Sequence, residues 1–353
     1  MIILKLKHIK LRCFNFIIYT LAIIALVACN GCVGQQEAAE VETNIQSTFD
    51  TSSTNTASTS IKKKLTITSA ICNDEQGPDC RKLRLGDDYH TNSTPQRGYL
   101  YSCDEKNPNA PGSVASKITW INFVENVWNF FEKPWLPEGS FRSDTGNYTE
   151  TLSTEDRKIN INNLPVDGKI GDWPMTNYSK LTEIDSNPGI PSSHSYSFTY
   201  PIQPSNTPSP ACVSLGAIGV TKNGVVIYSA VDGRGNDALA HEIVDVFGGH
   251  PAMSDYHYHF IPERLDNKHM SNGHSEIVGY INDGFPIYGY IGIAGVEMSN
   301  DDLDECHGHA HGLLGYHYHA TIEYPYTIGC YMGIPVLSSS NENTNISRPP
   351  PAR

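Results

Sequence analysis

The sequence has few helical signals, no excess of positive charge and none of the common short catalytic motifs. The formal net charge is −13 at pH 7, and no basic patch with interleaved aromatic residues occurs, which argues against nucleic acid as a partner. G-x-S-x-G, P-loop, G-x-G-x-x-G and H-E-x-x-H patterns are missing, so a serine hydrolase, a nucleotide enzyme and a zincin have no support. "HEIVD" begins like the zincin motif but carries Asp245 in place of the second histidine. Cations are the more natural ligands.

The long apolar run "FNFIIYTLAIIALVA" near the N-terminus is too short for a secure membrane span. Basic residues precede it, as in a signal peptide. The run ends in "LVAC", Leu26 to Cys29, which resembles the lipobox of bacterial lipoproteins, whose cysteine is lipidated. We therefore expect a lipoprotein signal peptide over residues 1–28 and a lipid anchor on Cys29, with an ordinary signal peptide as the alternative. Asn30 favours the outer membrane if the cell is Gram-negative.

Two segments are too polar to bury a core. Residues 29–62 are rich in serine and threonine and are predicted to form a flexible tether, and residues 338–353 are predicted to form a disordered tail. The residues between them, 63–337, have a uniform composition in which polar residues mix with Tyr, Val, Ile, Gly and Pro. They are expected to form a single exported domain.

The predicted domain contains an even set of cysteines, which in an exported protein favours disulfides but leaves their connectivity open. We expect Cys72 to pair with Cys80, Cys306 with Cys330, and Cys103 with Cys212. Because Cys306 adjoins several histidines, a thiolate metal ligand is the alternative for that residue.

Secondary-structure signals are mostly of the strand kind. Short runs such as "SYSFTYPI", "LGAIGV", "GVVIYSAV", "SEIVGYI" and "GFPIYGYI" are rich in β-branched and aromatic residues, and Asn-Gly in "TKNGVVIYSAV" indicates a hairpin. The best helical segment is "NDALAHEIVDVFGG", which would bring His241, Glu242 and Asp245 near one another, and a short helix is predicted to begin at Ser299 or Asn300. The fold class is therefore a β-rich α+β domain of mostly antiparallel strands with a few short helices.

The tetrapeptide Tyr-His-Tyr-His occurs twice in the chain, in "SDYHYHF" and in "LGYHYHA". Successive side chains of a strand point to opposite faces, so each copy offers two imidazoles on one face and two phenols on the other. Alternate histidines suit a metal ion, because two nitrogens can converge on it from one side of the strand. The predicted ligands are the histidine pairs of the two copies, with three supplementary histidines from "CHGHAH": His257, His259, His317, His319, His307, His309 and His311.

Imidazole suits several transition metals, of which copper or zinc is expected here. The candidate orienting or catalytic acids are Glu242, Asp283 and Asp304, so a hydrolase that uses metal-bound water is one alternative. In another alternative the histidines are structural and the domain serves adhesion or interaction. His250, His269 and His274 are equally available as ligands. If the doubling serves one site, both histidine pairs should meet in a shared pocket.

These residues resemble the YHYH-domain proteins over Gly98 to Pro335, in segments such as "KPWLPEGSF", "LPVDGKIGDWP", "HSEIVGYINDGFPIYGY" and "DLDECHGHAHGLLGYHYHATIEYPYTIGCYMG". The resemblance implies an exported, bacterial-type domain with a largely undefined role. This chain departs from the family pattern at Phe247, where a cysteine is common, which puts the partner of Cys212 in question. The linker "GLLG" before the second motif is also shorter.

Overall fold

The computed structural model describes residues 71–72, 77–139, 146–187, 189–336 and 339–340. The predicted signal peptide, the tether and Cys29 lie outside these residues. Within the range predicted as a tail, Ser339–Ser340 forms strand β17, which pairs with β8. No helix in the described ranges is long and apolar enough to cross a membrane.

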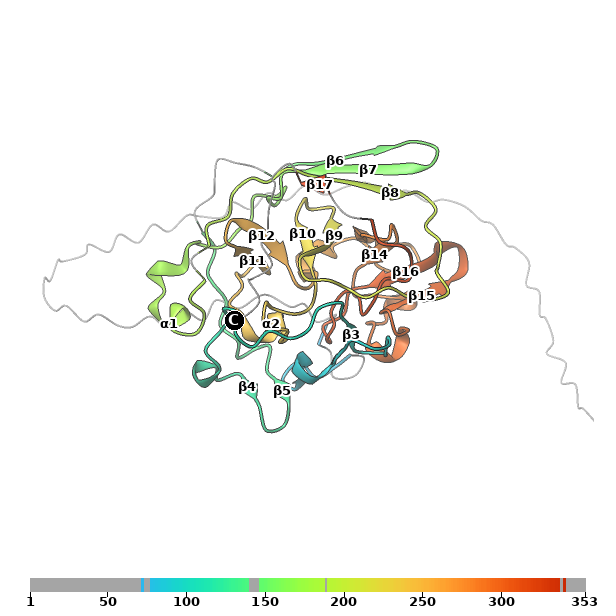
Figure 1. Cartoon of the computed structure of the whole chain (residues 1–353). Coiled ribbons are helices and arrows are strands. Elements are labelled where there is room, and N and C mark those ends of the chain that lie inside the picture. Colours follow the sequence, from blue (N-terminus) through green and yellow to red (C-terminus); the bar gives the residue numbers. More distant parts are fainter. Residues whose placement is uncertain (1–70, 73–76, 140–145, 188, 337–338, 341–353) are drawn as a thin grey trace, which may run out of the picture. The chain divides into compact units, whose positions relative to one another are not determined.

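The predicted β-rich class is confirmed: strands dominate, and they form sheets that are mostly antiparallel (Figure 1). The largest sheet has eight strands, in the order β11 (Gly249–Ala252), β12 (Asp255–Tyr258), β10 (Val226–Tyr228), β9 (Ala217–Thr221), β13 (Ile277–Ile281), β14 (Pro286–Tyr288), β16 (Gly315–His319) and β15 (Gly308–His311). A four-stranded sheet has the order β17, β8 (Tyr196–Pro201), β7 (Asp156–Ile161) and β6 (Tyr148–Leu152).

The remaining elements are short. Three strands form one small sheet and two form another: β1 (Leu83–Arg84), β5 (Val127–Trp128) and β4 (Ile121–Asn122); β2 (His90–Thr91) and β3 (Leu100–Tyr101). The described α-helices are α1 (Ser179–Thr182) and α2 (Ala238–His241). Single 3-10 turns occur at Gly86–Asp88, Ala115–Lys117, Met175–Asn177, Glu263–Leu265, Ile293–Gly295, Asn300–Asp302 and Gly312–Leu314.

The eight-stranded sheet consists of two halves with the same connectivity. In each half an antiparallel hairpin, β9–β10 or β13–β14, is joined by a parallel pairing to a second hairpin, β11–β12 or β15–β16. The halves meet where β9 pairs antiparallel with β13, and there Val220 lies opposite Tyr280, sixty positions later. A twofold rotation through this pair, perpendicular to the sheet, therefore relates the two halves approximately.

The sequence carries the same repeat at the same spacing. "IGVTKNGVVIYS" from Ile218 aligns with "VGYINDGFPIYG" from Val278, and each Tyr-His-Tyr-His copy follows at the same interval. Asp245 and Asp304 are equivalent as well: each accepts the backbone N–H of the glycine that begins the next strand, and each also accepts a tyrosine hydroxyl. The doubled tetrapeptide is thus part of a longer repeat, whose two copies lie between Ala217 and His319.

The two faces of the large sheet pack differently. Tyr256, Tyr258 and Tyr318 are fully buried in the main apolar core on one face. On the other face, Val226 and Val220 pack with Phe198 and other side chains of the four-stranded sheet, which covers the central strands. His257 lies opposite Val226 in register and shares its face. The predicted division of imidazoles and phenols between faces is confirmed, with the histidines flanking the covered centre.

The helix predicted over residues 236–249 ends early, at His241. Asp237 caps its start by accepting the N–H of Ala240, as expected. After His241 the chain becomes extended, because Val244 O accepts the N–H of Leu136 and the segment pairs there instead of continuing the helix. The predicted short helix near Ser299 is a single 3-10 turn, Asn300–Asp302, with a capping box. Tertiary pairing thus overrides helical propensity in this segment.

All three expected disulfides are present: Cys72–Cys80, Cys103–Cys212 and Cys306–Cys330. Cys306 is therefore bonded to sulfur rather than available as a thiolate ligand. Cys212 has Cys103 as its partner, so Phe247 leaves no cysteine of the described domain unpaired.

Candidate metal centres

A first histidine cluster, defined as His250, His257 and His259, lies where β11 pairs with β12. His250 and His257 are directly opposite in register, and His259 follows β12 on the same face as His257. The His259 Nε2 atom is 3.1 Å from the Nε2 atoms of both neighbours. All three rings are buried, and the ring of Tyr228 stacks on His257 at 3.9 Å between centroids.

Two of these imidazoles have their tautomers fixed by backbone carbonyls. His257 Nδ1–H donates to Asp255 O at 3.0 Å, and His259 Nδ1–H donates to Ser229 O at 2.5 Å. Each Nε2 therefore carries a lone pair, and these lone pairs face each other across 3.1 Å. Such a contact is repulsive unless a proton or a metal ion lies between the nitrogens.

A shared proton does not fill this role at neutral pH. Burial lowers the pKa of His257 to about 4, and burial together with the neighbouring His257 lowers the pKa of His259 to about 3. The pKa of His250 is held well below its usual value for the same reasons. Two nitrogens that bind one ion tetrahedrally at about 2.0–2.1 Å are separated by about 3.3 Å, close to the spacing seen here. The first cluster is therefore a group of side chains that could hold a metal ion.

Glu242 lies beside this cluster. Its Oε2 atom is 3.3 Å from His250 Nε2 and 3.5 Å from His259 Nε2. That oxygen is buried and has no hydrogen-bond partner among the described residues. Burial raises the pKa of the Glu242 carboxyl well above its usual range, helped by the charges of Asp232 and Asp185 and opposed by Lys133. A bound cation would satisfy this carboxylate and the imidazole nitrogens together.

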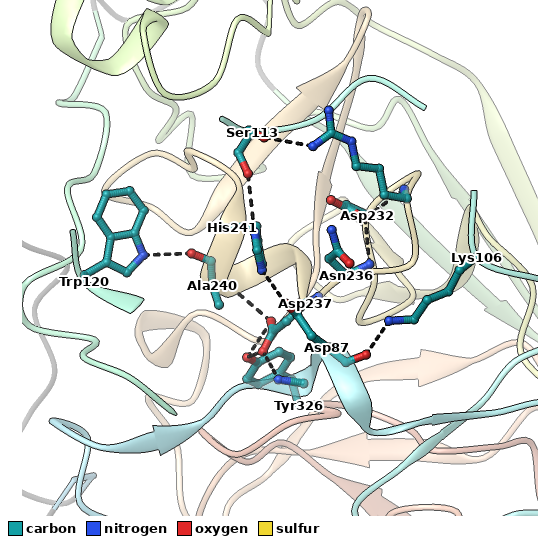
Figure 2. A network of polar contacts seen from close by, with 12 residues as sticks. Asp87, Lys106, Ser113, Trp120, Asp232, Asn236, Asp237, Ala240, His241 and Tyr326 are labelled. Carbon is teal, nitrogen blue, oxygen red and sulfur yellow. Dashed lines mark hydrogen bonds and ion pairs between the residues drawn. The ribbon is translucent and has the colours of Figure 1, made fainter. Parts of the chain in front are cut away.

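A network of polar contacts anchors α2 (Figure 2). Glu242 is the residue that follows the last residue of this helix, at its C-cap position. Asp237 accepts the Tyr326 hydroxyl at 2.8 Å, and His241 Nε2 lies 2.9 Å from Asp87 Oδ2. Trp120 Nε1 donates to Ala240 O at 2.8 Å. His241 thus serves to hold the helix, and it does not join the histidine cluster.

The order Asp87, His241, Ser113 in this network resembles a catalytic triad, since Ser113 Oγ lies 3.5 Å from His241 Nδ1 (Figure 2). Both Ser113 and His241 are buried. Asp87 also accepts the backbone N–H of Asp237. These contacts tie two separate segments, those of Asp87 and Ser113, to the two ends of α2, so we interpret the group as an anchor for Glu242.

The first cluster opens into a cavity of about 390 Å³. Its lining combines the three histidines and Glu242 with Tyr228, Asp185 and Asp232. Asp232 Oδ2 is another buried oxygen with no hydrogen-bond partner among the described residues. The cavity is therefore acidic, and it gives a small molecule or ion access to the imidazole nitrogens.

A second histidine cluster lies at the other flank of the sheet, where β15 pairs with β16. We define it as His274, His309, His311, His317 and His319. Four of them, without His319, place one ligand atom each within 4.8 Å of one another. The His319 ring centroid is 4.8 Å from that of His274 and 5.0 Å from that of His309. His309 and His311 are partly exposed, whereas the other three are buried.

The second cluster repeats the lone-pair arrangement of the first. Nδ1–H groups donate to backbone carbonyls from His274 (2.7 Å), His317 (2.9 Å) and His319 (2.7 Å). His317 Nε2 faces His309 Nε2 at 3.1 Å. The Nε2 atoms of His274, His311 and His319 are buried without a hydrogen-bond partner among the described residues. Burial lowers the pKa of His317 to about 3 and of His309 to about 4, so these rings are neutral at pH 7.

The expectation of one pocket shared by the two Tyr-His-Tyr-His copies is wrong. β12 and β16 are separated by four intervening strands, which at about 4.8 Å per step amounts to about 24 Å. Figure 1 shows β11 and β12 at one side of the sheet and β15 and β16 at the other. The twofold relation places each histidine pair in its own half. Two candidate centres replace the single one expected.

Three other predicted site residues lie outside both clusters. His307 takes the left-handed conformation in the turn before β15 and contacts Thr321 Oγ1 at 2.9 Å. Asp283 accepts the Tyr318 hydroxyl at 2.6 Å on the phenol face of the sheet, and Asp304 accepts the N–H of Gly308 in a turn. Asp304 lies in the turn before β15 and Asp283 in the turn between β13 and β14. The described contacts of both are with backbone N–H groups and tyrosine hydroxyls rather than with imidazoles.

His250 and His274 join the clusters although they were not among the predicted ligands. His250 precedes Pro251 on the strand opposite His257, and His274 precedes β13. The spacing of sixty between "IGVTKNG" and "VGYINDG" would have indicated two separate halves, and hence separate ligand sets. Glu242 was predicted as an orienting acid, and the structure places it directly at the first cluster.

The fold and the site together define the class of this protein: a duplicated β-sheet domain with buried histidine clusters. A family model described as "YHYH protein" matches residues 197–297, so the chain carries a YHYH domain, in agreement with the resemblance seen in its sequence. The matched residues span the central strands of both halves and the first histidine cluster. No match was found among curated proteins or among solved structures.

Proposed function

We propose that this protein is a cell-envelope lipoprotein whose YHYH domain binds transition-metal ions, copper or zinc, at its histidine clusters. The observation that carries the proposal is the pair of acceptor nitrogens, His257 Nε2 and His259 Nε2, held 3.1 Å apart with both protons committed to carbonyls. The second cluster supports it independently through His309 and His317. Carbonyl acceptors on the remote nitrogens are the usual means of orienting metal-bound imidazoles.

The location and partners follow from the sequence. Lipidation of Cys29 would anchor the protein to a membrane, the outer one in a Gram-negative cell, and the Ser/Thr-rich tether would hold the domain away from it. The partners in this proposal are metal ions and the membrane, and the net negative charge argues against nucleic acid.

A metal-dependent hydrolase is the second candidate function, favoured at the first cluster by one observation. The acidic cavity of about 390 Å³ gives a substrate access to the three imidazoles, and Glu242 is placed to accept a proton from an attacking water. An ion bound there would supply Lewis acidity and activate that water. Esters and phosphates are the substrate classes to assay.

Metal content tests the proposal. The full chain, purified without a polyhistidine tag, is expected to carry about two transition-metal ions per molecule. His257→Gln and His317→Gln should each remove about one ion, and the control His90→Gln, outside both clusters, should remove none. A metal-free protein whose melting temperature is unchanged by Cu²⁺ or Zn²⁺ would show instead that the histidines are structural, as in an adhesion or interaction domain.

A further inference from the structure

We infer that the two half-domains hold different metals: the first cluster takes a divalent ion that accepts mixed nitrogen and oxygen ligation, such as zinc, and the second takes copper. This inference rests on the proposed function and deepens it, because it assigns a separate ion to each half of a duplicated scaffold.

The shared part of both sites is a set of three imidazoles. His257 and His317 are equivalent, as are His259 and His319, at the spacing of sixty residues. Their Nδ1 partners are equivalent too: His259 donates to Ser229 O and His319 to Gly289 O. The third pair is His250, opposite His257, and His309, opposite His317. Each half of the duplicated domain thus contains the same three imidazoles at equivalent positions.

The ligands outside this shared set differ. In the first half Glu242 adds a carboxylate, whereas the acids at the equivalent place, Asp301 and Asp302, lie on an exposed turn where Asp302 caps Ser299. In the second half His311 extends β15 on the face of His309, and its counterpart on β11 is Ala252.

His274 is also particular to the second half. It packs against His319 at 4.8 Å between ring centroids, and the position sixty residues earlier is Ser214. Asp266, whose charge acts on His274, uses Oδ2 to accept Ser275 Oγ–H and the N–H of Tyr290. Its buried Oδ1 lies 3.6 Å from His269 Nε2 and has no hydrogen-bond partner among the described residues. The group of described side chains that could hold an ion in the second cluster therefore consists of imidazoles, and Asp266 and Asp302 act on His274 and His309 through their charge.

Because the two clusters offer different ligand atoms, they should prefer different metal ions. A carboxylate oxygen is a hard ligand and brings a negative charge, which favours zinc and similar divalent ions at the first cluster. Four or five imidazoles without an anionic ligand suit copper, which binds nitrogen ligands more tightly than the other divalent first-row ions. Because copper binds most sites of this kind strongly, the inference concerns the ratio of copper to zinc affinity, which is higher at the second cluster.

The two clusters also differ in how a solute can reach them from the surface. The first cluster is buried and reached through the acidic cavity, so an ion there can meet a small substrate while its imidazoles stay fixed. The second cluster presents His309 and His311 at the surface. Copper can be captured and released there by ligand exchange through these two partly exposed rings.

The test uses Co²⁺, a spectroscopic substitute for zinc, and Cu²⁺ on the full untagged chain. With one equivalent of each ion, Cu²⁺ is expected to show an all-nitrogen electron paramagnetic resonance spectrum that His317→Gln abolishes and His259→Gln preserves. Co²⁺ should show absorption bands with the opposite dependence. Glu242→Gln, which keeps the side-chain shape, should weaken Co²⁺ binding about ten-fold or more and leave the copper spectrum unchanged.

A gain-of-function variant keeps the test independent of folding defects. Ala252 is exposed and lines the cavity, so Ala252→His supplies the first cluster with the counterpart of His311 and should raise its copper affinity. Equal loss of both ions in His259→Gln and His317→Gln, or unchanged Co²⁺ affinity in Glu242→Gln, would overturn the inference while metal binding itself stands. A wild-type chain that binds neither ion would instead refute the proposed function.

Discussion

The buried histidines make the stability of the metal-free protein strongly dependent on pH. Burial lowers the pKa of His257 to about 4 and those of His259 and His317 to about 3, against about 6.5 in an unfolded chain. Below pH 6.5 the unfolded state binds these protons and the folded state does not, so stability is present above that pH and is lost as the pH falls toward the folded pKa values.

The magnitude follows from the same shifts. As the pH falls from 7 to 5, each of the three buried imidazoles lowers the free energy of unfolding by about 2 kcal/mol, so that the three together lower it by about 6 kcal/mol. A domain has about 5–15 kcal/mol to lose, so the metal-free protein should lose a large part of its stability at pH 5. Protons bind these rings only at low pH, so metal binding should persist at pH 5 and oppose this loss.

Urea unfolding with a chelator, at pH 7 and pH 5, measures the effect. The His257→Gln variant should show a pH-dependent loss smaller by about 2 kcal/mol than that of the wild type, because glutamine does not titrate. His194→Gln, outside both clusters, is the matched control and should behave as the wild type does. A wild-type loss below about 2 kcal/mol, or an identical loss in His257→Gln, would refute the assignment of these rings as buried and neutral.

Three further predictions concern the scaffold. Asp245→Ala leaves five donors without their acceptor and should cost about 3 kcal/mol or more in chemical unfolding; a cost below 1 kcal/mol would contradict its structural role. Tyr318→Phe removes the hydroxyl that Asp283 accepts and should cost about 1–3 kcal/mol while metal content stays unchanged; lost metal would place Asp283 at the site after all. The double variant Cys306→Ser with Cys330→Ser should lower thermal stability by about 2–5 kcal/mol; an equal melting temperature would argue against the bond.

The local chemistry of the histidine strands was predictable from sequence. Alternation along "YHYH" gave the correct face for His257 and for Tyr256, since that period depends only on the strand itself. The expected cysteine pairs are also present, although the even number of cysteines predicted only that disulfides form and left their connectivity open.

The arrangement of the sites depends on long-range pairing that no local pattern carries. The sequence suggested one pocket because the two copies share a motif, whereas the antiparallel contact of Val220 with Tyr280 places them on opposite flanks of the sheet. Glu242 was expected on a continuing helix; the chain instead leaves α2 at His241 to pair with Leu136. Local propensity cannot anticipate a partner a hundred residues away.

A duplicated domain with a histidine cluster in each half should carry one metal ion in each half. Anomalous X-ray scattering from crystals of the metal-loaded full chain, recorded at the absorption edges of zinc and copper, would locate these ions. We expect two peaks about 24 Å apart, one among His250, His257 and His259 and one among His309, His317 and His319. A single peak between the halves, or none at either cluster, would contradict this expectation.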